Sequence, residues 1–205
     1  MQASRNITGL YWHIDNNVLT RVEAKNLIRL SEIGWIYLGM SSIIEIEHMN
    51  VKDEDKKKLL AERRSLFVVS FAPHILGESL LGKSVLSSQE DEDRIRRVHQ
   101  TLWPIADIEK DSHSSGRRSM GRSRYRDSQI VANAIRYCAS ALVTHDQKIL
   151  EASERIRTAF NGFDVISIEA ATLRALASVD RKRRFARLRP SAPSIQNLPD
   201  WPPES

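Results

Sequence analysis

Apolar positions along the chain fall into short continuous runs, and these alternate with stretches of helical spacing or high charge. The runs are rich in Trp, Ile, Leu, Val and Phe, which is typical of buried strands. The predicted strands cover residues 10–19, 35–38, 66–71, 103–108, 141–144 and 163–168. The predicted helices cover residues 20–33, 53–64, 91–102 and 169–178, together with an Ala-rich helix that starts at Asp127. Strands alternating with helices predict an α/β fold, a three-layer α/β/α sandwich around a mostly parallel sheet.

The length of 205 residues, with 41% hydrophobic and 28% charged residues, suits one soluble domain with an appendage. We expect that domain to span residues 1–178. Within it, residues 110–126 are rich in Ser, Gly and Arg, which predicts an exposed, mobile loop. Residues 179–205 are first basic and then Pro-rich, and we interpret them as a flexible tail without its own core.

Charge and cysteine content indicate which partners and which cellular compartment to expect. The net charge is +5, and much of the positive excess lies in two arginine-rich clusters. Such clusters attract polyanions and suggest that the protein binds nucleic acid. The alternatives are that they dock an acidic protein or are simply solvated. Cys138 is the single cysteine, so the chain has no disulfide framework and a reducing compartment fits best. No apolar run approaches the length of a membrane span, and the sequence begins without an export signal, so we expect a cytoplasmic protein that contacts no membrane.

Acidic residues stand at the predicted strand ends and helix starts, where parallel sheets gather their active groups. They are Asp15, Glu47, Asp127 and Asp146. Each alone has an ordinary explanation as a helix cap or loop former. Together, converging carboxylates stay ionised only if a cation joins them, and hard oxygen ligands indicate Mg²⁺ or Mn²⁺. Such ions can promote hydrolysis of a phosphodiester without a covalent enzyme intermediate.

These segments resemble the PIN-domain ribonucleases. The run IDNNVL is similar to the family pattern D-T-N-V/I-L, with Asp15 and Asn17 at its acid and its asparagine. The run SSIIEIE resembles the family's serine-led helix that ends in a glutamate, which is Glu47 here unless a helical shift makes it Glu45. The resemblance covers about residues 8–178 and implies a PIN-like fold.

The second half of the chain carries two more matches. The helix from Asp127 resembles the pattern D-x-x-I-x-x-x-A, and LVTHD resembles L-V-T-x-D, which assigns Thr144 and Asp146. A further acid often follows two residues after the last one, and Lys148 stands there instead.

The resemblance implies a Mg²⁺- or Mn²⁺-dependent endoribonuclease. Its metal ligands would be Asp15, Asp127 and Asp146, Glu47 would bind metal or position water, and Asn17 and Thr144 would orient the cluster. It also implies RNA as the substrate, a toxin of a toxin–antitoxin pair with a protein antitoxin as partner, and a homodimer. Nucleic-acid binding is assigned to a basic group next to Asp127, formed by Arg117, Arg118, Arg122, Arg124 and Arg126.

Two alternatives remain open. Residues 77–84 read GESLLGKS, a literal phosphate-loop pattern in which Lys83 would bind phosphate and Ser84 would hold Mg²⁺. Five residues, including Pro73, separate this motif from the preceding predicted strand, whereas a phosphate loop leaves its strand directly, and Leu80 and Leu81 stand where small residues are usual. These departures favour an apolar helix edge, with the leucines facing the core. The other alternative is a PIN-like protein that binds RNA and has lost its catalytic site.

Overall fold

The computed structural model describes residues 6–44, 51–64, 67–70, 87–114 and 119–188. Within them lies one five-stranded parallel sheet with the strand order β3-β2-β1-β4-β5. The strands are β1 (Tyr11–Ile14), β2 (Tyr37–Ser41), β3 (Val68–Ser70), β4 (Ala141–Val143) and β5 (Asp164–Ile166). The predicted α/β class and the mostly parallel sheet are therefore confirmed.

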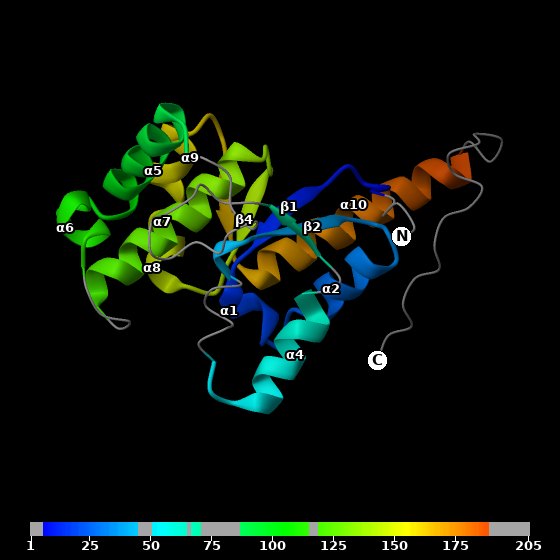
Figure 1. Cartoon of the computed structure of the whole chain (residues 1–205). Coiled ribbons are helices and arrows are strands. Elements are labelled where there is room, and N and C mark those ends of the chain that lie inside the picture. The colour runs from blue at the N-terminus through cyan, green and yellow to red at the C-terminus, as the bar shows by residue number, and fades with distance from the viewer. Residues whose placement is uncertain (1–5, 45–50, 65–66, 71–86, 115–118, 189–205) are drawn as a thin grey trace.

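Helices cover the sheet on both sides. The described helices are α1 (Asn16–Leu19), α2 (Lys25–Glu32), α4 (Glu54–Arg64), α5 (Gln89–Leu102), α6 (Ile108–Ser112), α7 (Met120–Arg136), α8 (Gln147–Glu151), α9 (Ser153–Ala159) and α10 (Ile168–Leu188). Helix α10 packs against α2, whereas α5 packs against both α7 and α9 in a separate group (Figure 1). The arrangement is consistent with a three-layer α/β/α fold.

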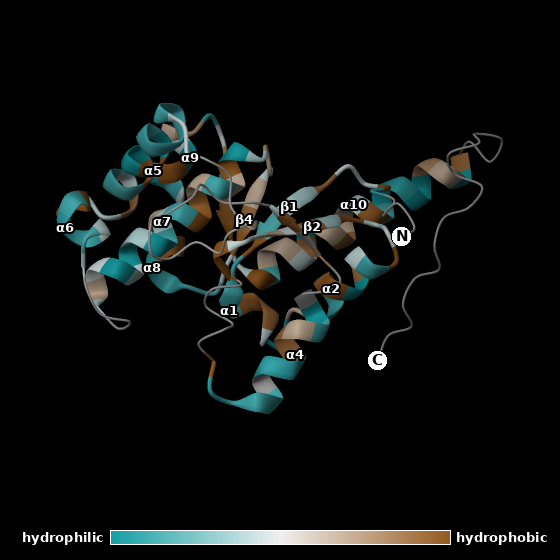
Figure 2. Cartoon of the chain, in the orientation of Figure 1, coloured by the Kyte–Doolittle hydropathy of each residue, from teal (hydrophilic) through white to brown (hydrophobic). Residues whose placement is uncertain are grey.

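The core explains why the strands read as continuous apolar runs. Both faces of a parallel sheet are covered by helices, so side chains pointing either way are buried. Along β1, Trp12 and Ile14 are buried on one face, and His13 between them is buried on the other. Figure 2 shows the most hydrophobic residues gathered along the sheet and the inner sides of the helices. No described helix has the length and apolar character needed to cross a membrane.

Two predicted strands differ from the structure. The strand predicted over residues 10–19 ends at Ile14, because Asp15 caps the one-turn helix α1 with its side chain. The strand predicted over residues 103–108 is wrong. Trp103 ends α5, its amide donating to the carbonyl of His99, and residues 104–106 form turns. Pro104 has no backbone N–H for a strand ladder, and the Trp103 ring packs on the core instead.

The predicted mobile loop over residues 110–126 is also wrong for much of its length. Residues 110–112 belong to α6, and residues 120–126 form the first two turns of α7. Ser119 caps α7 by accepting a hydrogen bond from the Arg122 amide, and Arg is a good helix former once a cap is present. Asp127 therefore lies inside α7 and is not its N-terminal cap.

The last helix also continues beyond its predicted end. We expected it to stop near Ser178, but α10 runs to Leu188 and includes the first part of the predicted tail. Its basic residues are helix formers, and Arg183 lies over the Trp35 ring at 5.8 Å, which gives this end of the helix a contact with the core.

Candidate active site

Three of the predicted acids line one cleft. Asp15, Asp127 and Asp146 border a space of about 370 Å³ at the carboxyl ends of the strands. Asp15 follows β1, Asp127 lies on α7, and Asp146 follows β4 and starts α8. The remaining lining residues are Asn16, Asn17, Thr20, Arg21, Val51 and Leu60. The structure thus places Asp15 in the same cleft as two acids that follow it by more than a hundred residues of sequence.

Helix and strand geometry explains why Asp127 and Asp146 line the same cleft. Helix α7 runs back along the sheet and turns into β4 near Cys138, which has a left-handed φ of 54°. Asp127 lies nine residues before the end of α7, about 14 Å along a helix that rises about 1.5 Å per residue. Asp146 lies five residues after Ala141, about 16 Å along backbone that rises about 3.3 Å per residue. Both acids therefore reach the same height above the turn.

Asp15 is buried in the cleft and held by several hydrogen bonds. Only 6% of it is exposed, and its carboxylate accepts three hydrogen bonds. Oδ1 accepts from the Asn16 amide at 2.6 Å, and Oδ2 accepts from the Asn17 side-chain amide at 2.9 Å and from the Thr144 hydroxyl at 2.7 Å. The Asn17 side-chain oxygen accepts from the amide of His145 at 3.0 Å, which ties the end of β1 to the end of β4. Asn17 and Thr144 therefore hold Asp15 in one orientation.

The electrostatics of Asp15 favour a positive partner. Burial raises the pKa of its carboxyl above the ordinary value, and the nearby charge of Asp146 raises that pKa further. The hydrogen bonds from Thr144, Asn16 and Asn17 act in the opposite direction. A buried carboxylate near a second carboxylate is stabilised either by binding a proton or by binding a cation. If Asp15 is ionised at neutral pH, the stabilising partner is a cation.

Asp146 has a structural role as well as a place in the cleft. Its Oδ1 accepts from the amides of Lys148 at 2.8 Å and Ile149 at 3.3 Å, so it caps α8. Its own amide donates to the Thr144 hydroxyl at 3.0 Å. Thr144 therefore connects Asp146 to Asp15, since the same hydroxyl donates to the Asp15 carboxylate. Lys148 is exposed on α8.

The donor chemistry of the cleft suits a hard divalent cation, since carboxylate oxygens are the ligands that Mg²⁺ and Mn²⁺ prefer. The acids of the cleft lie farther apart than the ligands of a complete metal site. In the part of the chain that the structure describes, no three His, Cys, Asp or Glu side chains are close enough to hold one metal ion together. Glu47 and its alternative Glu45 lie outside the described residues, as do the phosphate-loop pattern at 77–84 and its Lys83 and Ser84.

The basic group assigned to nucleic acid is only partly available for that role. Arg117 and Arg118 lie outside the described residues. Arg122 and Arg126 are half-buried on α7 and make contacts of their own. Arg124 makes two hydrogen bonds to Asp111, from Nε and Nη2, each of 2.7 Å. The structure thus gives Arg124 a structural ion pair where we expected an exposed phosphate contact.

That ion pair belongs to a buried network that holds α5, α6 and α7 together. Asp111 is 4% exposed and also pairs with the fully buried His99, with 3.0 Å between Oδ2 and Nε2. The hydrogen bonds from Arg124, with support from His99, hold the pKa of Asp111 below its usual range. Gly121 permits this close approach, because a Cβ there would lie 2.5 Å from the Asp111 carboxylate. Arg124 lies one turn before Asp127, so the network fixes the part of α7 that carries this acid.

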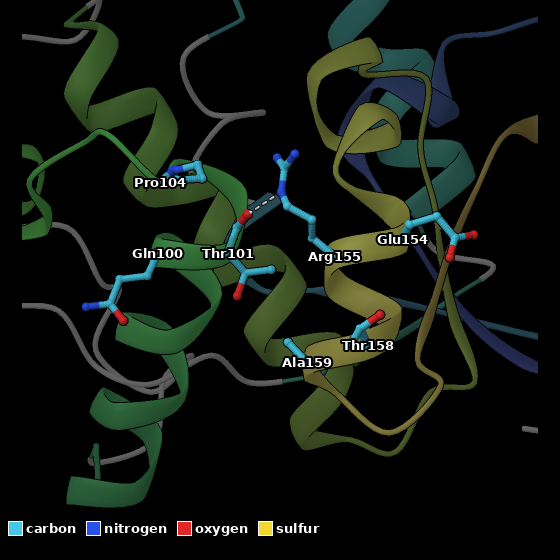
Figure 3. A pocket seen from close by; sticks show the side chains of 7 residues that line it. All are labelled: Gln100, Thr101, Pro104, Glu154, Arg155, Thr158 and Ala159. Carbon is cyan, nitrogen blue, oxygen red and sulfur yellow. Dashed lines mark hydrogen bonds between the residues drawn. The ribbon is translucent and has the colours of Figure 1, made fainter.

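A larger hollow lies elsewhere and offers less chemistry. Its volume is about 510 Å³, and it lies between α5 and α9 (Figure 3). Glu154 is its single acid, and Arg155 is held by the end of α5, with Nε donating to the Thr101 carbonyl at 3.0 Å. Figure 3 shows no convergence of acids in it. The smaller acidic cleft is the better candidate site because three aspartates line it.

A charged cleft residue, Arg21, was not identified from the sequence. Arg21 lines the cleft six residues after Asp15. The strand predicted to continue to Leu19 would have carried Arg21 away from Asp15, whereas the observed helix α1 turns the chain back to the cleft. A helix of one turn leaves too little periodicity in the sequence to reveal it.

Comparisons with known proteins identify no relative of this chain: no family model, no curated protein and no solved structure matches it.

Proposed function

We propose that the protein is a divalent-metal-dependent endoribonuclease with a PIN-like fold, and that the acidic cleft is its active site. The observation that carries the proposal is that three aspartates from three separate elements line one cleft, with Asp15 buried and held by Asn17 and Thr144. A fold does not require this arrangement, because burying a carboxylate near a second one costs stability unless a cation joins them.

Each residue has a part in the proposed reaction. Asp15 is held so that its carboxylate cannot turn away, and Asp127 and Asp146 face the same space from α7 and from the end of β4. These three acids, with Glu47, would hold Mg²⁺ or Mn²⁺. When bound, the cation would polarise the phosphodiester and increase the acidity of the attacking water. By its resemblance to PIN-domain toxins, the protein would have an antitoxin protein as its partner and act as a homodimer in the cytoplasm.

Cleavage of labelled RNA by the wild-type chain and by Asp127→Asn tests the proposal. Loss of a direct metal ligand should reduce metal-dependent cleavage by more than the roughly 10- to 100-fold seen when outer-shell partners are removed. Asp93→Asn is the matched control, because Asp93 is an exposed α5 residue that does not line the cleft. Activity should require Mg²⁺ or Mn²⁺ and disappear with chelator. Equal cleavage by wild type and Asp127→Asn would contradict the mechanism.

One observation favours a second candidate, an RNA-binding protein without cleavage activity. The acids that the structure describes do not form a group of three around one point. The same assay separates the two functions. A wild-type chain that binds RNA and leaves it intact with Mg²⁺ and with Mn²⁺ would support the second candidate and overturn the first.

A further inference from the structure

Arg21 is the one cationic side chain among the described residues that line the acidic cleft. Three of the other lining residues are the aspartates, so an ion pair between Arg21 and one of them would be the ordinary outcome. The structure shows no hydrogen bond or ion pair from the Arg21 side chain within the described ranges, and the residue is exposed. A cationic residue thus lines the cleft beside three acids, and within the described residues it forms an ion pair with none of them.

The backbone of Arg21 is held although its side chain is not. Arg63 on α4 donates from Nη1 to the carbonyl of Leu19, and the same atom lies 3.4 Å from the carbonyl of Arg21. These contacts attach the segment after α1 to α4. Leu60, from the same helix, is buried in the wall of the cleft. The Arg21 side chain therefore starts from a fixed point on the rim.

An RNA strand that enters this cleft is repelled by the charges of its acids. The phosphates of RNA are negative, and the acids repel them wherever no cation intervenes. The arginines on α7 do not solve this problem, because Arg124 is paired with Asp111 and Arg122 and Arg126 are half-buried. An exposed guanidinium on the rim offers two parallel N–H groups that match phosphate oxygens.

We propose that Arg21 binds a backbone phosphate of the RNA strand and so positions the strand over the acids. The inference rests on the proposed RNA substrate and adds a residue to that site. Arg21 is a binding and positioning residue in this account, because it reads the sugar–phosphate backbone and not the base sequence. It should therefore act on affinity for all RNA sequences alike.

Fluorescence anisotropy with a short labelled single-stranded RNA tests this role. Binding is measured in Mg²⁺ over a series of KCl concentrations, with Asp127→Asn present in every protein so that cleavage does not interfere. Adding Arg21→Gln should raise Kd about tenfold, the effect of losing one charged hydrogen-bonding group. The slope of log K against log salt should fall in magnitude by about 0.7, the value for one phosphate contact on a single strand.

Two further variants separate a specific contact from general charge. Arg21→Lys keeps the charge and loses the paired N–H geometry, so it should retain the salt slope and recover part of the affinity. Arg29→Gln removes an equal charge from an exposed α2 residue paired with Glu32, and it should leave both Kd and slope unchanged. In the cleaving wild-type background, Arg21→Gln should raise KM with little change in kcat.

The outcomes are distinct. A Kd and salt slope for Arg21→Gln equal to those of its parent would overturn the role of Arg21, as would an equal effect of Arg29→Gln. RNA binding that depends on Arg21, in a wild-type protein that cleaves nothing, would support the inference and overturn the nuclease function. Cleavage that is indifferent to Arg21 would overturn the inference alone. A wild-type protein that binds no RNA would overturn both.

Discussion

The substitution Asp111→Asn tests the network that fixes α7. In the native protein the buried Asp111 carboxylate accepts two hydrogen bonds of 2.7 Å from Arg124 and faces His99 at 3.0 Å. The substitution leaves the guanidinium and the imidazole without their anion. Breaking a buried ion pair by removing one partner costs about 3–5 kcal/mol. The Arg124 side chain is 27% exposed and can turn partly to water, so we expect the lower value, about 3 kcal/mol.

Urea unfolding followed by far-ultraviolet circular dichroism measures this loss. With a denaturant slope of about 2 kcal/mol per molar urea, a loss of about 3 kcal/mol lowers the midpoint by about 1.5 M. Glu109→Gln is the matched control, because Glu109 is 61% exposed and forms a surface ion pair with Arg96. Such a pair contributes less than about 1 kcal/mol.

The pH dependence of the free energy of unfolding provides a second test of the Asp111 ion pair. The pKa of Asp111 is lower in the folded protein than in the unfolded chain, where it is about 4. Its stabilisation is therefore complete above about pH 4 and is lost as the pH falls through the folded-state value. The gap in unfolding free energy between wild type and Asp111→Asn should be constant at neutral pH and narrow in acid. A loss no larger than that of Glu109→Gln, or a gap that acid leaves unchanged, would refute the reasoning.

Two other predictions concern buried polar groups. Thr144→Val keeps the shape of a fully buried side chain but removes the hydroxyl that donates to Asp15 and accepts from the Asp146 amide. Mn²⁺ affinity and cleavage should fall about 10- to 100-fold, and the two groups left without their partner should lower the free energy of unfolding by about 1–3 kcal/mol. Unchanged Mn²⁺ affinity by titration calorimetry would count against the positioning of Asp15. Burial lowers the pKa of His13 from 6.5 to about 4. Between these pH values the folded protein binds fewer protons than the unfolded chain, so the free energy of unfolding falls by roughly 3 kcal/mol as the pH is lowered from one value to the other. In His13→Phe this part of the pH dependence of urea unfolding should vanish, and an equal dependence in both proteins would show that His13 is not its source.

The strands of the fold were predictable where the sequence carries a continuous apolar run. Continuous apolar runs located the five observed strands, because strands covered on both faces must be apolar throughout. The strand predicted at residues 103–108 failed because Trp103 and Ile105 appear strand-like in a short window. The structure buries Trp103 partly at the end of α5 and leaves Ile105 fully exposed in a turn. Short apolar runs do not distinguish these cases.

The sequence also located the acids of the candidate site, although it did not show how α7 is held. Asp15, Asp127 and Asp146 were located from their places near strand ends and on one helix, and the structure puts all three in one cleft. Composition alone suggested that residues 110–126 form a solvated loop. A cap at Ser119 and an ion pair between Arg124 and Asp111 make much of this stretch helical, and pairing of this kind depends on tertiary contacts that the local sequence does not show.

The central claim is that the acids of the cleft hold a divalent cation. A crystal of the wild-type protein soaked in Mn²⁺ and measured near the manganese absorption edge tests it most directly. We expect anomalous density in the cleft, within ligand distance of Asp15 and of Asp127 or Asp146, and its loss in a soaked crystal of Asp127→Asn. Saturating Mn²⁺ with no anomalous density in the cleft would contradict the claim.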